Sequence, residues 1–185
     1  MAEMLAGVSA GTVALILLAG FAGHLLHPRA LPAALAAHRT LPGPLVWPAA
    51  IAVGALEGVL GAATGYALLA GRPRALELGA TGSGLLFTAY AIYGLYVLRT
   101  RPSVPCGCAA DGTPMSGWVA GRAAALALAS VTASAGAGSA VASHGVHVTI
   151  VGLSSVVFAA LLWSLPPALS DPETALSDPE RSPAG

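Results

Sequence analysis

The sequence contains little charge, and it has no lysine, asparagine or glutamine. Only 9% of its 185 residues are charged and 56% are hydrophobic, whereas an average soluble domain has roughly 25% charged residues. Its eight basic residues are all arginines, they form no basic run, and the formal net charge is zero. We therefore expect no nucleic-acid partner, and the composition is that of a protein whose main partner is the lipid bilayer.

Long apolar segments predict an all-α integral membrane protein. A window of about 18 or more apolar residues is typical of a transmembrane helix. Such segments cover residues 5–26, 46–70, 76–98, 118–135 and 146–165. The first four predict a four-helix transmembrane bundle over 1–135, and the last predicts an additional transmembrane helix within 136–165. Four spans with a buried hairpin is the alternative, because residues 134–145 are small and neutral rather than polar.

The two ends of the chain are read differently. Glu3 precedes the first apolar segment, where a secretory signal would carry Arg or Lys, so we expect this helix to be retained. Residues 166–185 are rich in proline, serine and acidic side chains and cannot form a core. They predict a disordered tail.

Helices that cross a membrane in alternation sort their ends onto two faces. We call the face with the N-terminus face A and the opposite one face B. Face B receives the end of the first helix, the connection 28–45 and the loop that follows the third helix. It also receives all three tryptophans, Trp47, Trp118 and Trp163, and tryptophan is enriched at membrane–water boundaries.

The orientation of these faces is left open by two opposing arguments. Face B carries four arginines and face A two, which makes face B cytoplasmic by the positive-inside rule; they are Arg29, Arg39, Arg99 and Arg101 against Arg72 and Arg74. A disulfide on face B argues for the other side, because disulfides persist outside the cytoplasm. Our working expectation is an extracytoplasmic face B.

Glu57 lies near the bilayer centre in the second predicted helix, where an ionisable side chain is expensive and has to face the bundle interior. It adjoins a stripe of small residues that lets another helix approach closely, formed by Gly54, Gly58, Gly61 and Gly65. A structural clamp and a role in proton or quinone chemistry are equally compatible with this position. Arg122 enters the fourth helix from face B and either reaches toward Glu57 or turns back to the interface.

Three tyrosines recur at helical spacing in the third segment, at Tyr90, Tyr93 and Tyr96. Residues three apart lie on one gradually rotating face of a helix. An aromatic packing stripe is the simpler interpretation, since buried tyrosines commonly bond through their hydroxyls. Tyr93, with Glu57 and Arg122, completes our set of candidate polar residues inside the membrane.

Both cysteines, Cys106 and Cys108, lie in one loop and flank a single glycine. Such a pair can form a strained disulfide, and strained disulfides exchange readily. The redox pair is therefore the leading interpretation. A metal site is the weaker alternative, because it would need His24 and His27 from the same face as further ligands and the usual paired spacing of zinc sites is absent. The sequence shows no cofactor motif, and it leaves a quinone or a metal open.

The order of these features resembles the methylamine utilisation protein MauE family, which is related to the DoxX group of redox-associated membrane proteins. The residues that carry the resemblance are His38–Pro42, Ala55–Gly58 with Glu57, the Cys106–Cys108 loop, Thr113-Pro114 and Gly121-Arg122. The resemblance covers roughly residues 5–130. The chain departs from the family pattern after Cys108, where Ala-Ala-Asp replaces the common Phe-Gly.

The resemblance implies a four-helix core and a role in maturation, disulfide formation or export of a partner protein. In the type case the client is the disulfide-rich small subunit of methylamine dehydrogenase, and a thioredoxin-like protein works beside it. By the resemblance Cys106 and Cys108 carry thiol–disulfide exchange, and the chain is either a thiol–disulfide oxidoreductase or its accessory. The alternatives are a membrane scaffold protein and a metal or small-molecule carrier.

Overall fold

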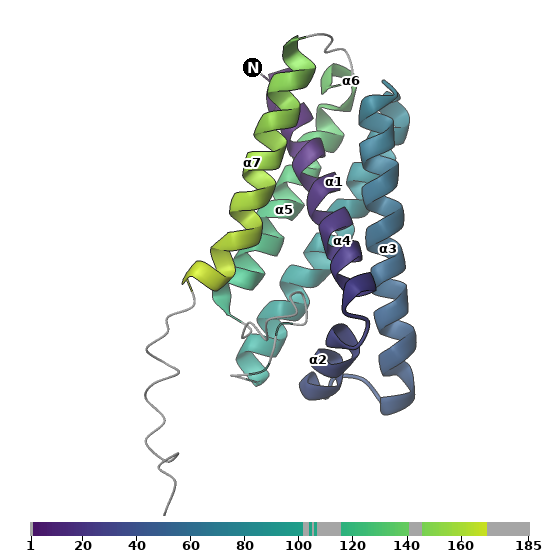
Figure 1. Cartoon of the computed structure of the whole chain (residues 1–185), viewed down its shortest axis with the longest axis vertical. Helices are drawn as coiled ribbons and strands as arrows, with labels where there is room; N and C mark the ends of the chain where they lie inside the picture. Colours follow the sequence, from purple (N-terminus) through teal and green to yellow (C-terminus); the bar gives the residue numbers. More distant parts are fainter. Residues whose placement is uncertain (1, 102–103, 105, 107–115, 141–145, 170–185) are drawn as a thin grey trace, which may run out of the picture.

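A computed structural model describes residues 2–101, 104, 106, 116–140 and 146–169 of the chain. Within these residues every regular element is a helix (Figure 1). The helices are α1 (Ala2–Leu26), α2 (Ala30–His38), α3 (Gly43–Leu69), α4 (Pro73–Thr100), α5 (Gly117–Ala135), α6 (Ala137–Ala140) and α7 (Val146–Leu169). The predicted all-α membrane bundle is confirmed.

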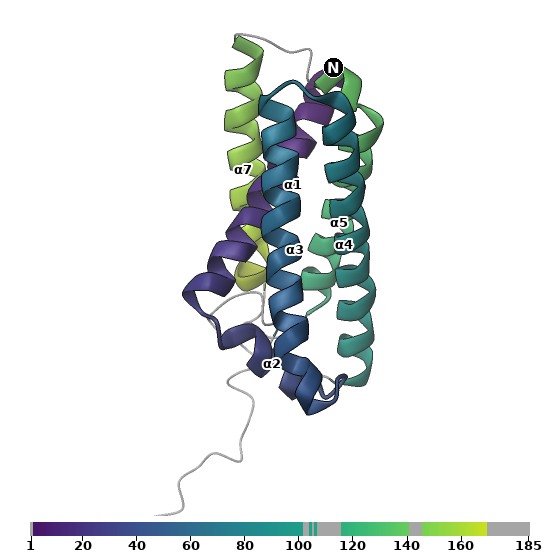
Figure 2. The same cartoon turned by 90° about the vertical axis from the view of Figure 1, so that its right-hand side faces the viewer.

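Four described helices, α1, α3, α4 and α5, are long and apolar enough to cross a membrane. Their bounds lie within three residues of the predicted segments. Successive crossings run in opposite directions, which puts the two predicted faces at opposite ends of the bundle (Figures 1 and 2). At a rise of about 1.5 Å per residue, even the shortest of the four, α5, approaches the thickness of a bilayer core.

Helix α7 runs along the bundle from face A to face B (Figure 1). It contains the apolar stretch Val148–Ser164 and ends at Leu169, inside the segment expected to be a tail. The additional membrane crossing and the domain limits stay predictions. Residues 170–185 lie outside the described residues.

A short helix, α2, occupies the connection 28–45, for which no element was predicted. It lies at face B, below the end of α1 and beside the start of α3 (Figures 1 and 2). Leu35 of α2 packs with Val46 and Ala50 of α3 in a small core cluster. Nine residues are too few for a recognisable membrane segment, and the burial that stabilises this helix comes from its contact with α3.

The predicted glycine stripe of α3 packs against α1, as its small side chains favour. A Cβ added at Gly58 would meet the Phe21 ring at 3.1 Å, and one at Gly61 would meet Leu17 Cβ at 3.0 Å. Gly54 approaches His24 in the same way, with its nearest contact at 3.8 Å. This register brings Glu57, on the same helix, to the α1 surface near His24.

Helices α3 and α4 are joined by a tight turn. Gly71 has a φ of +64°, which only glycine adopts readily, and Pro73 starts α4, where its missing N–H is no loss. The two helices then pack closely, because Gly79 of α4 leaves room for Thr64 of α3. The turn therefore fixes the antiparallel pair from which Glu57 and Tyr90 project.

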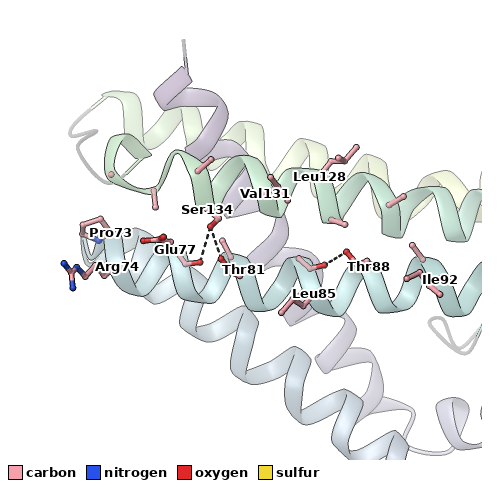
Figure 3. Close-up of a pocket in the computed structure, with 18 of the residues that line it drawn as sticks. Pro73, Arg74, Glu77, Thr81, Leu85, Thr88, Ile92, Leu128, Val131 and Ser134 are labelled. Atoms are coloured by element: carbon pink, nitrogen blue, oxygen red, sulfur yellow. Dashed lines mark hydrogen bonds between the residues drawn. The ribbon is translucent and has the colours of Figure 1, made fainter.

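A surface hollow of about 910 Å³ lies along α4 and α5 (Figure 3). Thr81 Oγ1 and Ser134 Oγ, 2.9 Å apart, bridge the two helices there, and Arg74 and Glu77 lie at its face A end. None of the predicted site residues that the structure describes lines this hollow. The candidate site lies elsewhere, inside the bundle.

Candidate functional site

A cavity of about 400 Å³ opens within the face B half of the bundle. Its walls come from α1 to α5 together with Trp163 of α7, and most of them are aliphatic or aromatic. A small set of polar or reactive side chains lines it as well: His24, His38, Glu57, Tyr90, Tyr93, Cys106 and Arg122. An apolar pocket with a few convergent polar groups is the usual form of a small-molecule site.

Glu57 is the ionisable centre of this cavity and is only 7% exposed. Tyr90 Oη donates a 2.9 Å hydrogen bond to Glu57 Oε1. His24 Nε2 lies 3.1 Å from Glu57 Oε2, which is within ion-pair distance. The His24 contact lacks hydrogen-bond geometry, since Oε2 accepts no hydrogen bond from the described residues. Helices α1, α3 and α4 thus meet at one carboxyl group.

Gly20 provides the space that this carboxyl group occupies. A Cβ at residue 20 would lie 3.0 Å from Glu57 Oε2 and 3.2 Å from its carboxyl carbon. That separation is tighter than ordinary van der Waals contact, so the glycine lets α1 pass directly over the carboxyl. Its absent side chain therefore contributes to the position of Glu57 between His24 and Tyr90.

A second polar group ties α2 to α4. The Tyr93 hydroxyl lies 2.9 Å from His38 Nδ1 and 2.8 Å from Thr40 Oγ1. One hydroxyl can donate to one of these atoms and accept from the other, so both contacts can be satisfied together. His38 is only 2% exposed. His38 and Tyr93 both line the cavity.

Arg122 and Trp163 meet at the border of the cavity with α7. The Arg122 guanidinium carbon lies 5.7 Å from the centre of the Trp163 ring, within the range of a cation–π contact. Of the two fates expected for Arg122, the reach toward Glu57 is not observed, because the ion-pair partner of Glu57 within the described residues is His24.

Cys106 lies against the bundle interior, although it belongs to a loop in the sequence. It is 7% exposed and packs with Val97 of α4 and Val119 of α5. It also lines the cavity that contains Glu57. Cys108, the other half of the predicted pair, lies outside the described residues.

The residues of the weaker metal hypothesis do not come together in the described part of the chain. His24 turns inward to Glu57, whereas His27 is exposed. No group of three or more His, Cys, Asp or Glu side chains within that part is arranged to hold a metal ion. With Cys108 outside it, the full set of four proposed ligands stays a prediction.

The structure also brings in residues that the sequence did not single out for the site. His38 is buried because α2 folds back onto α3, and Tyr90 proves to be the hydrogen-bond partner of Glu57. Helical spacing did place Tyr90 and Tyr93 on one face, whereas Tyr96 is 55% exposed. The remaining signal for Tyr90 was its position in a membrane segment, where its hydroxyl needs a partner.

These features define a class: a multi-pass membrane protein whose helix bundle encloses a largely apolar cavity with buried polar groups and a cysteine. The sequence pattern of the family described as methylamine utilisation protein MauE matches residues 1–138. The chain belongs to this family, as the resemblance predicted. No curated protein and no solved structure matches the chain. Helix α7 lies beyond the matched region but supplies Trp163 to the cavity.

Proposed function

We propose that this membrane protein supports thiol–disulfide exchange in the maturation, disulfide formation or export of a partner protein, through Cys106 and Cys108. The observation that carries the proposal is the place of Cys106. It is buried at the junction of α4 and α5 and lines the same cavity as Glu57, Tyr90 and Arg122. What supports the proposal is therefore the position of this sulfur beside the polar groups of the cavity.

The exchange itself needs a disulfide between Cys106 and Cys108 and a dithiol on the client. A client thiolate attacks one sulfur of the pair, and a mixed disulfide forms. The second client thiolate then displaces this sulfur, which leaves the client oxidised and the pair as two thiols. A thioredoxin-like protein is the partner that the family resemblance suggests for the transfer, and an extracytoplasmic, disulfide-containing protein is the client.

Thiol trapping in the cells that make the protein tests this proposal. We expect Cys106→Ser and Cys108→Ser to leave client cysteines open to maleimide, and one of the two single variants to accumulate a mixed disulfide. Gly121→Ala is a suitable control, because a Cβ there meets nothing within 4 Å. The proposal would be contradicted if both wild-type cysteines were fully alkylated without reductant and the client disulfides were intact in both variants. A scaffold role would then be the better explanation.

The side of the membrane is tested with the same cysteines. A membrane-impermeant maleimide should label Cys108 of intact cells, after mild reduction, if face B is extracytoplasmic. Labelling that requires lysis would place face B in the cytoplasm, in agreement with its excess of arginine. That result would contradict exchange with an extracytoplasmic client.

A further inference from the structure

We propose that the cavity in the face B half binds an amphiphile with an acidic head group and an apolar chain, and that Arg122 holds the head group. This inference does not depend on the proposed thiol–disulfide exchange. Three properties of the cavity support it: the charge of Arg122, the apolar wall beside it, and the order of the two across the membrane.

Arg122 has no acidic partner among the described residues. The carboxyl group of Glu57 has His24 within ion-pair distance, at 3.1 Å, and accepts a hydrogen bond from Tyr90. The contact of Arg122 is with the Trp163 ring instead. A cation–π contact uses the charge of a guanidinium and leaves its N–H groups able to donate. Because an uncompensated charge in apolar surroundings is costly, this part of the cavity favours an anion.

The wall beside Arg122 is apolar on the side of the bilayer centre. Helix α5 starts at face B (Figure 1), so Leu126, one turn after Arg122, lies about 6 Å further into the membrane. Leu126 packs with Ile16, Leu17 and Phe87 in one core cluster, and all four side chains line the cavity. An acidic head at Arg122 therefore has its chain directed toward the bilayer centre, as a lipid has in the leaflet at face B.

The size and the border of the cavity suit such a ligand. Its volume of about 400 Å³ falls within the roughly 300–1,000 Å³ of small-molecule sites. Arg122 and Trp163, at the border with α7, are both partly exposed, so a molecule outside the bundle can reach the guanidinium. A small water-soluble anion would gain nothing from the apolar wall, and an uncharged chain would leave Arg122 without an anion.

Two kinds of head group share this chemistry. A fatty acid presents a carboxylate, and an anionic phospholipid presents a phosphate. Both accept paired hydrogen bonds from a guanidinium, which binds either group more specifically than an ammonium does. The experiment therefore uses one probe of each kind.

Binding is measured with the full chain in nanodiscs of phosphatidylcholine, to which radiolabelled oleate is added. We expect saturable binding, because the cavity holds a limited volume of ligand. Oleyl alcohol, which has the same chain without the charge, should not displace the oleate. Phosphatidylglycerol is then included in the nanodisc. Displacement of oleate would show that the site also accepts a phosphate head group, whereas undisturbed oleate binding would restrict the ligand to a carboxylate.

A pair of arginine variants tests the role of the charge. Arg122→Gln should weaken oleate affinity at least about tenfold, because it removes a charged hydrogen-bond donor. Arg99→Gln is the matched control: Arg99 also lies near face B, but it is exposed and does not line the cavity. It should leave the affinity unchanged. An equal loss in both variants would mean that oleate is attracted by the general charge of face B, and would overturn the proposal.

A pair of alanine variants on α5 locates the chain. Ala123 is buried and lines the cavity, whereas Ala125 is exposed and does not. Ala123→Phe should fill the space and abolish oleate binding, and Ala125→Phe should bind as the wild type does. Far-UV circular dichroism confirms that both variants are folded. If Ala123→Phe does not fold, the two arginine variants decide the question.

Three results would overturn the proposed site. The first is the absence of saturable binding of oleate and of phosphatidylglycerol. The second is displacement of oleate by oleyl alcohol at the same concentration as by unlabelled oleate, since the charge would then be irrelevant. The third is wild-type affinity in Arg122→Gln or in a folded Ala123→Phe, which would place the lipid on the outer surface of the bundle.

Discussion

The two halves of the bundle differ in the size of their core side chains. In the face A half the core consists largely of small residues, namely Ala6, Ala10, Ala67, Ala80, Ala133, Ala137 and Ala140 around Leu76. In the face B half the core contains Phe87, Tyr90, Tyr93 and Trp163, and a cavity remains among them. Small side chains let neighbouring backbones approach closely, whereas the large rings of α4 and α7 line the cavity of the face B half.

The polar groups of the two halves differ in kind. In the face A half, hydroxyls bond to carbonyls of their own helix, as Ser83 Oγ does to Gly79 at 2.8 Å, or to a neighbouring helix, as Thr81 Oγ1 does to Ser134 Oγ at 2.9 Å. In the face B half, the contacts between helices involve a carboxyl group, two imidazoles and two phenol hydroxyls, from Glu57, His24, His38, Tyr90 and Tyr93. With its small core residues the face A half is a rigid clamp, whereas the site in the face B half depends on side chains from several helices.

The largest loss of stability is expected in the face A half, from Gly79→Val. A Cβ at this residue would lie 2.8 Å from Thr64 Oγ1 and 3.3 Å from Thr64 Cα, and the backbone atom cannot yield easily. Overpacking of this kind costs about 1–3 kcal/mol. Far-UV circular dichroism during unfolding in SDS measures it, with Gly121→Ala as control. A variant as stable as the wild type would show that this half is not a rigid clamp.

In the face B half we expect Glu57→Leu to lower stability by about 1–3 kcal/mol, because the Tyr90 hydroxyl and His24 lose their partner. Glu57→Gln keeps an acceptor for Tyr90 and should lose less. The same SDS unfolding assay compares the two variants. A more stable leucine variant would mean that the carboxyl is retained at the expense of stability, as a buried charge can be.

Tyr93→Phe should loosen α2 while the membrane helices stay intact. It removes both hydroxyl contacts, to His38 and Thr40, at a cost of about 1 kcal/mol. Hydrogen exchange should therefore accelerate in Ala30–His38 and not in α4. Tyr96→Phe is the control, because it changes a tyrosine without these contacts. Equal hydrogen exchange in the two variants would show that the Tyr93 hydroxyl does not stabilise α2.

The smallest effect on stability, below about 1 kcal/mol, is expected from Gly20→Ala. This variant tests whether the site in the face B half depends on the position of the Glu57 carboxyl. The added Cβ would press on the Glu57 carboxyl, whereas one at Gly23 on the same helix meets nothing within 4 Å. Thiol–disulfide exchange with the client should therefore fall in Gly20→Ala and persist in Gly23→Ala. Equal rates in the two variants would show that the position of the carboxyl does not matter.

The sequence predicted the membrane helices because their apolar runs are a direct consequence of the solvent around them. It also predicted the interior position of Glu57 and the packing of the glycine stripe against another helix. The first follows from the free-energy cost of an ionisable group in lipid, and the second from the small size of glycine along one helix face. The partner of Glu57 could not be predicted. Whether His24 or Arg122 reaches it depends on the register of α1 against α3, which is set by contacts such as Gly61 with Leu17.

Tertiary packing also decided the features that were missed. The fold of α2 onto α3 buries His38, although the sequence around it reads as a connection. Cys106 was correctly assigned to a loop, but its burial against Val97 and Val119 follows from how α4 and α5 end. No local sequence pattern predicts the burial of His38 or of Cys106. Candidate sites assembled from several helix ends are therefore poorly visible in a single sequence.

Helix α7 packs on α1 through Ser155, whose hydroxyl lies 3.2 Å from the Val8 carbonyl oxygen, and through Gly7, which faces Val151. In binding terms α7 is a tethered ligand of the family domain. Its attachment raises its effective concentration, so a weak intrinsic affinity suffices to keep Trp163 beside Arg122. The covalent connection therefore helps to hold this part of the cavity wall in place.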